Sequence, residues 1–404
     1  MKICYLSLLL STGAALAEEA TLPTIWQAVQ ARHPAARVAE ASWLAAEGDW
    51  HQARIWNNPE LSFEGENLGG DFSGTDTAEW TLSLSQLIEW PGRRSRRIRS
   101  ARLDRADGEW ESKSMMRNLA IDVSRSFYET LALQEKMKLN LDAVEQAKAF
   151  VRMAELRVKV GKSTVLESNK AQVELARHEL QREANERELS SALEHIGRLT
   201  GWASPPGALI GVLHDTPAPP DRAAVTEALK ATAAYAFKQA EVKRRKLALL
   251  DASRAWIPDL VLAAGFRQND ADETQSYLGQ VGLEFPLWNR GKGQQLAATA
   301  RLHRAESEQA LMDQELQTEA MKRSAHLRLQ WRTIQRYQDE ILPLLSKHAE
   351  QAERSYREGW SGYLEYLEAR RDYREQKASH IDTLKDYHIE YLSIHPLRET
   401  NDEN

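Results

Sequence analysis

The sequence repeats itself once, over a very long period. The segment Gly161–Glu167 (GKSTVLE) is followed 198 residues later by the similar segment Gly359–Glu365 (GWSGYLE), and the same offset places Ala171 on Ala369. Solenoid proteins repeat roughly every 20 to 50 residues, so this spacing excludes that class. The repetition instead predicts two long, related halves and a fold with internal pseudo-symmetry.

The N-terminal residues have the pattern of a secretory signal peptide. Lys2 precedes a short apolar run, and Ala15-Leu16-Ala17 supplies a small-x-small cleavage site, so residues 1–17 are expected to be removed. The only cysteine, Cys4, lies inside this segment. The mature chain would therefore have no disulfide, no thiolate metal site and no thiol nucleophile.

The composition excludes two further classes of protein. Acidic residues outnumber basic ones by 59 to 53, which gives a formal net charge of −6 and argues against a nucleic-acid partner. The sequence also has no uninterrupted apolar stretch near the roughly 18 residues that indicate a membrane-spanning helix. A membrane role, if present, must depend on strands.

Most of the remaining chain has the pattern of long helices. Between Arg93 and Val160 there is no proline and a single glycine, Gly108. Apolar residues recur there at three- and four-residue spacing, which is typical of a helix with coiled-coil character. A return helix is expected to end near Leu199, and the second half repeats the pattern. Pro343 is expected to kink the second long helix, because proline removes a backbone donor and clashes with the preceding turn.

Ahead of each predicted helical hairpin lies a stretch with the period of a β-strand. In the first half an apolar set alternates with a polar set: Trp80, Leu82 and Leu84 against Thr81, Ser83 and Ser85. In the second half apolar residues alternate over 260–266 and again over 277–285, with a turn at 269–272. Each half is therefore predicted to contribute one β-hairpin, with strands of about ten residues that are long enough to cross a bilayer.

Four such strands cannot form a closed structure within one chain. They would leave two open edges and one apolar face, an arrangement that is unstable in water. In a membrane the strands must close into a barrel, and barrels of this kind use about eight strands or more. Two chains would supply about eight strands and three about twelve, and the larger barrel can enclose a channel. A soluble protein with exposed or edge-paired hairpins is the alternative.

The duplicated order of β-hairpin and very long helical hairpin, behind a signal peptide and with Gly-x-Ser-x-x-Leu-Glu at both tips, resembles the TolC-like outer-membrane efflux family. The resemblance covers residues 22–396. The segments Gln86–Arg94 (QLIEWPGRR) and Phe285–Gly293 (FPLWNRGKG) resemble the heavy-metal (cobalt–zinc–cadmium type) RND branch of that family. Many members carry a lipid on an N-terminal cysteine, which this chain lacks, so no lipid anchor is implied.

The resemblance implies a mainly α fold with a transmembrane β part. Three chains would close a twelve-stranded barrel in the outer membrane of a Gram-negative bacterium and an α-helical tunnel in the periplasm. This homotrimer would be the exit duct of a tripartite efflux pump for heavy-metal cations, with a periplasmic adaptor and an inner-membrane RND transporter as partners. Two alternatives are the channel of a drug efflux or type I secretion system and, in another class, a periplasmic coiled-coil adaptor without membrane strands.

The predicted boundaries follow from these features. They are 1–17 signal peptide, 18–57 N-terminal periplasmic segment and helix, 58–91 first β-hairpin in the outer membrane, 92–200 first helical hairpin with its tip near 161, 201–222 inter-repeat linker, 223–256 helix, 257–288 second β-hairpin in the outer membrane, 289–396 second helical hairpin with its tip near 359, and 397–404 C-terminal tail.

Charged residues near the tips are the candidates for a gate. Glu365 and Glu368 lie one helical turn apart, and the resemblance implies that acidic residues at these positions ring the periplasmic entrance of the closed channel. Glu167 and Lys170 hold the matching positions in the first repeat, and a Lys170–Glu368 pair between neighbouring hairpins is a hypothesis. The alternative is local, since Glu365 favours a helix N-terminus and Thr164 with Glu167 has the pattern of a capping box.

Two further surfaces are predicted. An adaptor is expected to dock on the tips, at Val160, Gly161, Ser163, Val165, Leu166, Gly359, Ser361, Tyr363 and Leu364. The membrane interface is expected at Trp80, Trp90, Tyr277 and Trp288, with ordinary packing at strand ends as the alternative. Gly161 and Gly359 are also predicted to end their helices as C-caps.

The sequence shows no pattern of a catalytic, metal or cofactor site. Its eleven histidines contain no pair at three- or four-residue spacing, and His-Glu-x-x-His does not occur. They are interpreted as surface or core residues. The sequence also lacks a nucleophile elbow, a phosphate loop and a dinucleotide fingerprint. We therefore expect no enzyme activity, no cofactor and no tight metal site.

Overall fold

The computed structural model describes residues 20–68, 75–89, 92–283, 287–288 and 290–395. The predicted signal peptide, the C-terminal tail and Trp90 lie outside these residues. The chain divides into two compact units. The sheet unit comprises Val38–Ser114 and Leu229–Glu319, and the hairpin unit comprises Met1–Arg37, Met115–Ala228 and Ala320–Asn404.

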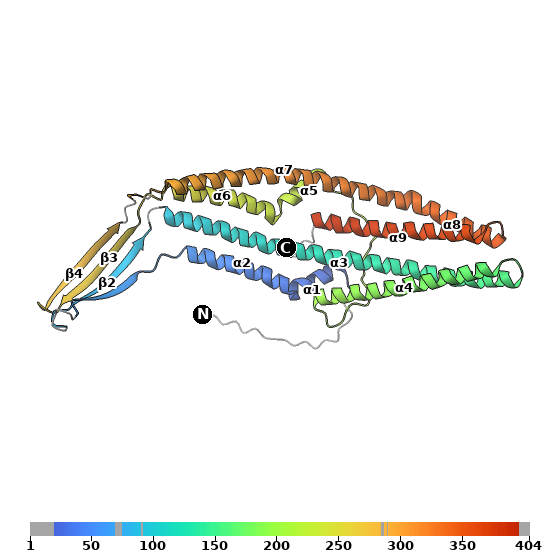
Figure 1. The fold of residues 1–404 in the computed structure, drawn as a ribbon, viewed down its shortest axis with the longest axis horizontal. Helices are drawn as coiled ribbons and strands as arrows, with labels where there is room; N and C mark the ends of the chain where they lie inside the picture. Colours follow the sequence, from blue (N-terminus) through green and yellow to red (C-terminus); the bar gives the residue numbers. More distant parts are fainter. Residues whose placement is uncertain (1–19, 69–74, 90–91, 284–286, 289, 396–404) are drawn as a thin grey trace, which may run out of the picture. The chain divides into compact units, whose positions relative to one another are not determined.

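The sheet unit contains four antiparallel strands in the order β1-β2-β3-β4 (Figure 1). Their bounds are Glu60–Glu66 for β1, Glu79–Ile88 for β2, Leu260–Asn269 for β3 and Thr274–Leu283 for β4. The two hairpins of the duplicated halves are joined by pairing between β2 and β3, so β1 and β4 form the edges. Both predicted β-hairpins are therefore confirmed, although β1 is shorter than the ten residues expected.

The register of the strands gives the sheet one apolar and one polar face. Leu82 lies opposite Phe63 and Phe266, whereas Ser83 lies opposite Ser62 and Gly265. Residues directly opposite each other share a face, so the alternation seen in the sequence is confirmed. The apolar face holds large exposed side chains, namely Leu61, Phe63, Leu82, Leu84, Leu262, Tyr277, Val281 and Leu283.

The helices of the sheet unit pack closely around the N-terminal part of α3 (Arg93–Lys159). A Cβ atom added to Gly108 of α3 would lie 2.4 Å from the Cβ of Ala46, in helix α2 (Pro34–Ala53), so glycine permits this approach. Arg244 of helix α6 (Ala233–Ser253) forms ion pairs with Asp104 and Asp107 of α3. Helix α7 (Lys292–Arg336) joins α6 through a 2.7 Å ion pair between Lys238 and Glu308.

Two predicted helices are each interrupted. The N-terminal helix is divided into α1 (Leu22–Arg32) and α2, because His33 precedes Pro34 and adopts an extended conformation. The helix predicted over 223–256 is divided into α5 (Arg222–Lys230) and α6, with Thr232 as the N-cap of the second. The single helix predicted over 223–256 was therefore wrong, and the segment and helix predicted over 18–57 consists of two helices.

The hairpin unit contains both hairpin tips and the adjoining parts of α3 and α7. The first pairs α3 with α4 (Val165–Thr200), and the second pairs α7 and α8 (Leu342–Glu358) with α9 (Tyr363–Ile394) (Figure 1). Between α7 and α8 the backbone forms a π-helix at Tyr337–Ile341. Pro343 has no N–H for the carbonyl of Asp339, four residues earlier, and this accounts for the change of helix type. The helix is thus interrupted next to Pro343, and the predicted kink itself stays a prediction. Among the helices that the structure describes, none is both long and apolar enough to cross a bilayer.

The linker between the repeats is fastened to the helices of the hairpin unit. The backbone of Leu209 exchanges two hydrogen bonds with the side chain of Gln134, at 2.8 and 3.1 Å. Tyr387 donates to the Pro217 carbonyl at 2.6 Å, and His388 bonds the Leu213 carbonyl at 2.9 Å. His388 is buried, as expected for a core histidine.

Candidate functional site

Both hairpin tips are closed by the same backbone turn. Gly161 and Gly359 have φ angles of 72° and 86°, in the left-handed region that favours glycine. A backbone bond spans five residues at each tip, from Lys162 N to Arg157 O and from Trp360 N to Ser355 O, both 2.8 Å. The glycines therefore end their helices in related turns, as predicted from the repeat.

Glu167 connects the first hairpin tip to the second. Its carboxylate accepts a hydrogen bond from Ser163 Oγ at 2.5 Å and another from the hydroxyl of Tyr356, which lies on α8. Thr164 is the N-cap residue of α4, but its side chain forms no capping bond. The predicted capping box is therefore wrong, because Ser163 and Tyr356 hold the Glu167 side chain instead.

Arg157 of α3 contacts both the backbone and the ring of Tyr356. Arg157 donates to the backbone carbonyl of Tyr356 at 2.9 Å, and the guanidinium lies 4.6 Å from the centre of the tyrosine ring. Burial and the adjacent Glu167 carboxylate raise the pKa of Tyr356 well above its usual value. The phenol therefore remains a hydrogen-bond donor at any physiological pH.

A second connection lies on the same face, one heptad further along α4. Glu174 pairs with Arg177 of its own helix at 2.9 Å and with Arg371 of α9. Its side chain is only 11% exposed. A hydrogen bond to a charged, partly buried group contributes more than one on the surface. Glu174 and Arg371 thus form the stronger type of contact between the two hairpins.

The third connection joins His178 of α4 to Arg374 of α9, with 2.7 Å between His178 Nε2 and Arg374 Nη1. Arginine can only donate, so Nε2 must accept and the imidazole must be neutral. Burial, followed by the charge of Arg374, lowers the pKa of His178 to about 4. The bond therefore exists only while His178 is unprotonated.

We expect mild acid to loosen this third connection. The folded-state pKa lies below the ordinary value of about 6.5, so the unfolded tip binds more protons and stability falls as the pH drops from about 7 towards 4. For this half-buried group the loss is on the order of 1 kcal/mol by pH 5. The protection factors of the amides over residues 165–180, which correct for the slower intrinsic exchange in acid, should be lower at pH 5 than at pH 7. His178→Gln keeps an acceptor that does not titrate, so an equal pH effect in that variant would contradict this assignment.

Aromatic rings fill the space between the hairpins beside these bonds. Phe150 of α3 stacks on Tyr363 and Tyr366 of α9, with ring centres 4.7 and 4.8 Å apart, and contacts Tyr356 at 5.0 Å. Tyr363 is only 7% exposed in this cluster. Its side chain is thus not available on the tip surface where an adaptor was expected to dock.

The remaining predicted docking residues lie at or near the surface. Val160, Val165, Leu166 and Leu364 are each more than 60% exposed, and Trp360, which the prediction omitted, is 84% exposed. Gly161 and Gly359 are exposed at the turns, and Ser163 and Ser361 are half-buried. The tips thus present several apolar side chains with no covering residue in the described chain.

The predicted gate carboxylates lie together on the second hairpin. Glu365 and Glu368 are exposed and, with Asp372, line a hollow of about 440 Å³ between α8 and α9. Lys170 is also exposed, and within the described part of this chain it forms no ion pair with Glu368. A pair between neighbouring chains therefore stays a prediction.

The predicted interface aromatics lie in the sheet unit. Trp80 stacks on Phe63 with ring centres 5.4 Å apart and donates from Nε1 to Asp270 at 3.0 Å. Tyr277 and Trp288 are 90% and 93% exposed. Trp80 thus packs against Phe63 at a strand end, whereas the rings of Tyr277 and Trp288 are almost fully exposed to solvent.

Several residues that join the hairpins were not predicted from the sequence, namely Glu174, His178, Tyr356, Arg371 and Arg374. A signal was present, because Glu174 follows Glu167 by one heptad and the arginines of 370–374 lie on the other hairpin at matching distance from its tip. Complementary charge on two predicted helices is informative only once they are known to be neighbours.

Comparisons with known proteins agree with this architecture. The family model "Outer membrane efflux protein" matches residues 25–202. The "Cobalt-zinc-cadmium resistance protein CzcC" of Cupriavidus metallidurans is 27% identical over 343 residues, covering 84% of this chain and 80% of the relative. The "Nickel-cobalt-cadmium resistance protein NccC" of Alcaligenes xylosoxydans xylosoxydans is 26% identical, covering 79% and 72%.

Solved channel structures share the fold. Crystal structures of CusC match with a TM-score of 0.72 at 16% identity, covering 93% of this chain and 91% of theirs. The outer membrane protein VceC of Vibrio cholerae matches with a TM-score of 0.72 at 14% identity, covering 94% and 97%. These are TolC-like channels, so the predicted fold of the single chain, mainly helical with four antiparallel strands, is confirmed, whereas the trimeric barrel stays a prediction. The family model and the sequence relatives agree with this likeness, so the chain is similar to outer membrane efflux proteins over the residues that they match.

Proposed function

We propose that this outer membrane efflux channel is the exit duct of a tripartite pump that exports heavy-metal cations. The relatives that match over most of the chain are named for resistance to cobalt, zinc, cadmium and nickel. The observation that carries the duct itself is the four-stranded sheet, which has one exposed apolar face, one polar face and two open edges.

Such a sheet supports a homotrimer. The backbone groups at the edges β1 and β4 need partners in lipid, and sister chains can supply them. Three copies would give a barrel of about twelve strands with its polar face towards a water-filled lumen, which is wide enough for a hydrated ion. The strands would lie in the outer membrane and the helical hairpins would extend into the periplasm.

The duct would be passive and gated at its tips. The bonds that Glu167, Glu174 and His178 form with the second hairpin would hold the tip of each chain closed, and separating the hairpins would open it. The exposed apolar residues Val165, Leu166, Trp360 and Leu364 provide a surface for a periplasmic adaptor, which would link the duct to an inner-membrane RND transporter. The acidic residues Glu365, Glu368 and Asp372 would attract cations at the entrance. No step in this function requires catalysis.

Metal tolerance of a deletion strain tests the substrate. We expect growth to fail at lower concentrations of cobalt, zinc, cadmium or nickel than in the parent, and the intact gene to restore it. The same strain should accumulate more of that metal. A strain that became sensitive only to dyes and drugs would assign the channel to a drug pump, and one that lost only a secreted protein would assign it to type I secretion.

Cell fractionation tests the class of protein. The duct should be found in the outer membrane as an oligomer that resists detergent but dissociates on heating. A periplasmic adaptor would instead fractionate without such an oligomer.

A further inference from the structure

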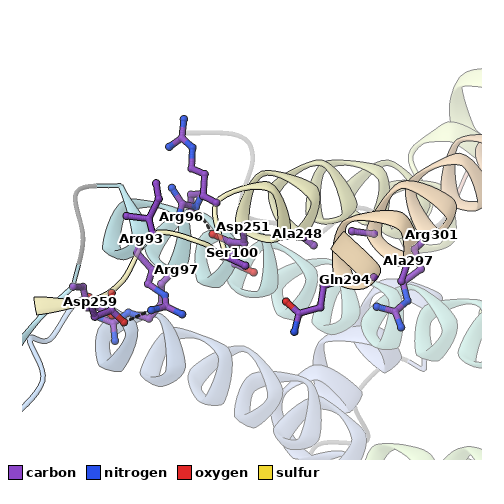
Figure 2. A pocket seen from close by; sticks show the side chains of 17 residues that line it. Arg93, Arg96, Arg97, Ser100, Ala248, Asp251, Asp259, Gln294, Ala297 and Arg301 are labelled. Atoms are coloured by element: carbon purple, nitrogen blue, oxygen red, sulfur yellow. Dashed lines mark hydrogen bonds and ion pairs between the residues drawn. The ribbon is translucent and has the colours of Figure 1, made fainter. Parts of the chain in front are cut away.

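The sheet unit contains a large cavity that the transport function does not use. It lies where helices α3, α6 and α7 approach the start of strand β3, and its volume is about 830 Å³ (Figure 2). Small side chains of α6 and α7 line part of it, namely Ala248, Ala252, Ala297 and Ala298. Because alanines line it, the space is not filled by the protein.

Arginines dominate the polar lining of this cavity. Three of them pair with carboxylates: Arg93 with Asp259, Arg96 with Asp251, and Arg97 with Glu89. These pairs join α3 to α6 and to the strand ends, and they neutralise the charges involved. They account for every carboxylate among the lining residues.

Two lining arginines are left over. Arg254 follows the end of α6, and Arg301 lies on α7, where Figure 2 shows it at the edge of the cavity. Neither guanidinium has a hydrogen bond or an ion pair among the residues that the structure describes. Among the lining residues that the structure describes, two positive charges are therefore unpaired, and both belong to exposed side chains.

The ends of two helices add to this positive potential. Both α3 and α7 begin at the cavity, and neither has an acidic residue in its first turn. Helix α3 instead begins with Arg93, Arg94, Arg96 and Arg97. A helix N-terminus carries a partial positive charge and is stabilised by anions, so four arginines there have the unfavourable sign. An anion in the cavity would offset both the helix ends and the two unpaired guanidinium groups.

We propose that this cavity binds a phosphate group, which Arg254 and Arg301 contact directly. The planar guanidinium group matches two oxygens of a phosphate, and helix N-termini supply backbone donors to the same kind of ligand. The volume leaves room beyond the phosphate for a lipid headgroup or a small phosphorylated molecule. The site rests on the fold alone and does not depend on which substrate the channel exports.

Thermal unfolding of the purified full mature protein in neutral detergent tests this site. In one arm inorganic phosphate replaces chloride at constant ionic strength. In the other arm phosphatidylglycerol replaces diacylglycerol, which has no phosphate, in mixed micelles. At about a hundredfold excess over Kd, a bound ligand should raise the Tm by about 2–5 °C. A response to both ligands indicates a site open to free phosphate, and a response to phosphatidylglycerol alone indicates a lipid headgroup.

Variants make the test specific. Arg254→Gln with Arg301→Gln should abolish the rise in Tm, whereas Arg254→Lys with Arg301→Lys keeps the charges and should weaken binding several-fold. Arg187→Gln with Arg332→Gln removes two exposed arginines of the hairpin unit and should leave the response unchanged. The absence of any rise in Tm with both phosphate and phosphatidylglycerol in the native protein, or a full response in the glutamine variant, would overturn the proposal. Since no transport is measured, this result is independent of the metal-tolerance experiment.

Discussion

Channels that carry Glu174→Gln together with Tyr356→Phe should be open far more often than the native protein. The first change removes the charge that holds Arg371, and the second removes the only proton that Tyr356 donates to Glu167. Hydrogen bonds to charged groups contribute about 1.5–3 kcal/mol each. Arg371 is 47% exposed, so its share is reduced by solvent. Losing both should still shift the balance between closed and open tips by at least about 2 kcal/mol, which is more than tenfold.

Single-channel recording in planar bilayers measures this directly. The double variant should spend most of its time in a high-conductance state that the native channel enters rarely. The matched control is Glu179→Gln with Tyr373→Phe. It removes a carboxylate from the same helix, α4, and a phenol from α9, which belongs to the same hairpin as Tyr356, at positions that form no bond between the hairpins in the described chain. If the double variant and its control conduct alike, the bonds between the hairpins do not hold the gate.

The comparison with the sequence shows which parts of this fold are encoded locally. The offset of 198 residues predicted the positions of both tips. It could do so because a chain that reverses direction after a helix favours a residue with a positive φ at the turn, as at Gly161 and Gly359. The alternation of Leu82 and Ser83 likewise placed the two faces of the sheet, since a strand has a period of two. These features depend on a few neighbouring residues and can be recognised without the rest of the chain.

Other features depend on which elements are neighbours. The partners Glu167 and Tyr356 are 189 residues apart, and neither helix indicates that the other faces it. Tyr363 follows a tip directly and was expected on the surface, but the ring of Phe150 on the other hairpin buries it. The interruption between α1 and α2 could have been predicted from Pro34 itself. The interruption before α6 was indicated only by a potential N-cap residue, Thr232.

The largest effect on assembly is expected from Gly279→Arg. Gly279 lies in the middle of β4 on the apolar face, opposite Ala264, and a Cβ atom added there would meet nothing within 4 Å. An arginine therefore fits without steric strain, and its cost comes from lipid alone. That cost is about 2–4 kcal/mol near the middle of a bilayer, and a trimer bears it in every chain. Little or no heat-sensitive oligomer should reach the outer membrane, and metal tolerance should fall with it.

Two neighbouring substitutions separate lipid exposure from other causes. Gln280→Arg places the same side chain one residue further along β4, on the polar face opposite Ala263, and assembly should be retained because the arginine points into water. Gly279→Leu tests the loss of glycine itself and should also assemble, since leucine suits a lipid-facing position. If Gly279→Arg and Gln280→Arg assembled equally well, the face holding Leu82 and Tyr277 would not contact lipid. The sheet would then need another explanation for its exposed apolar side chains.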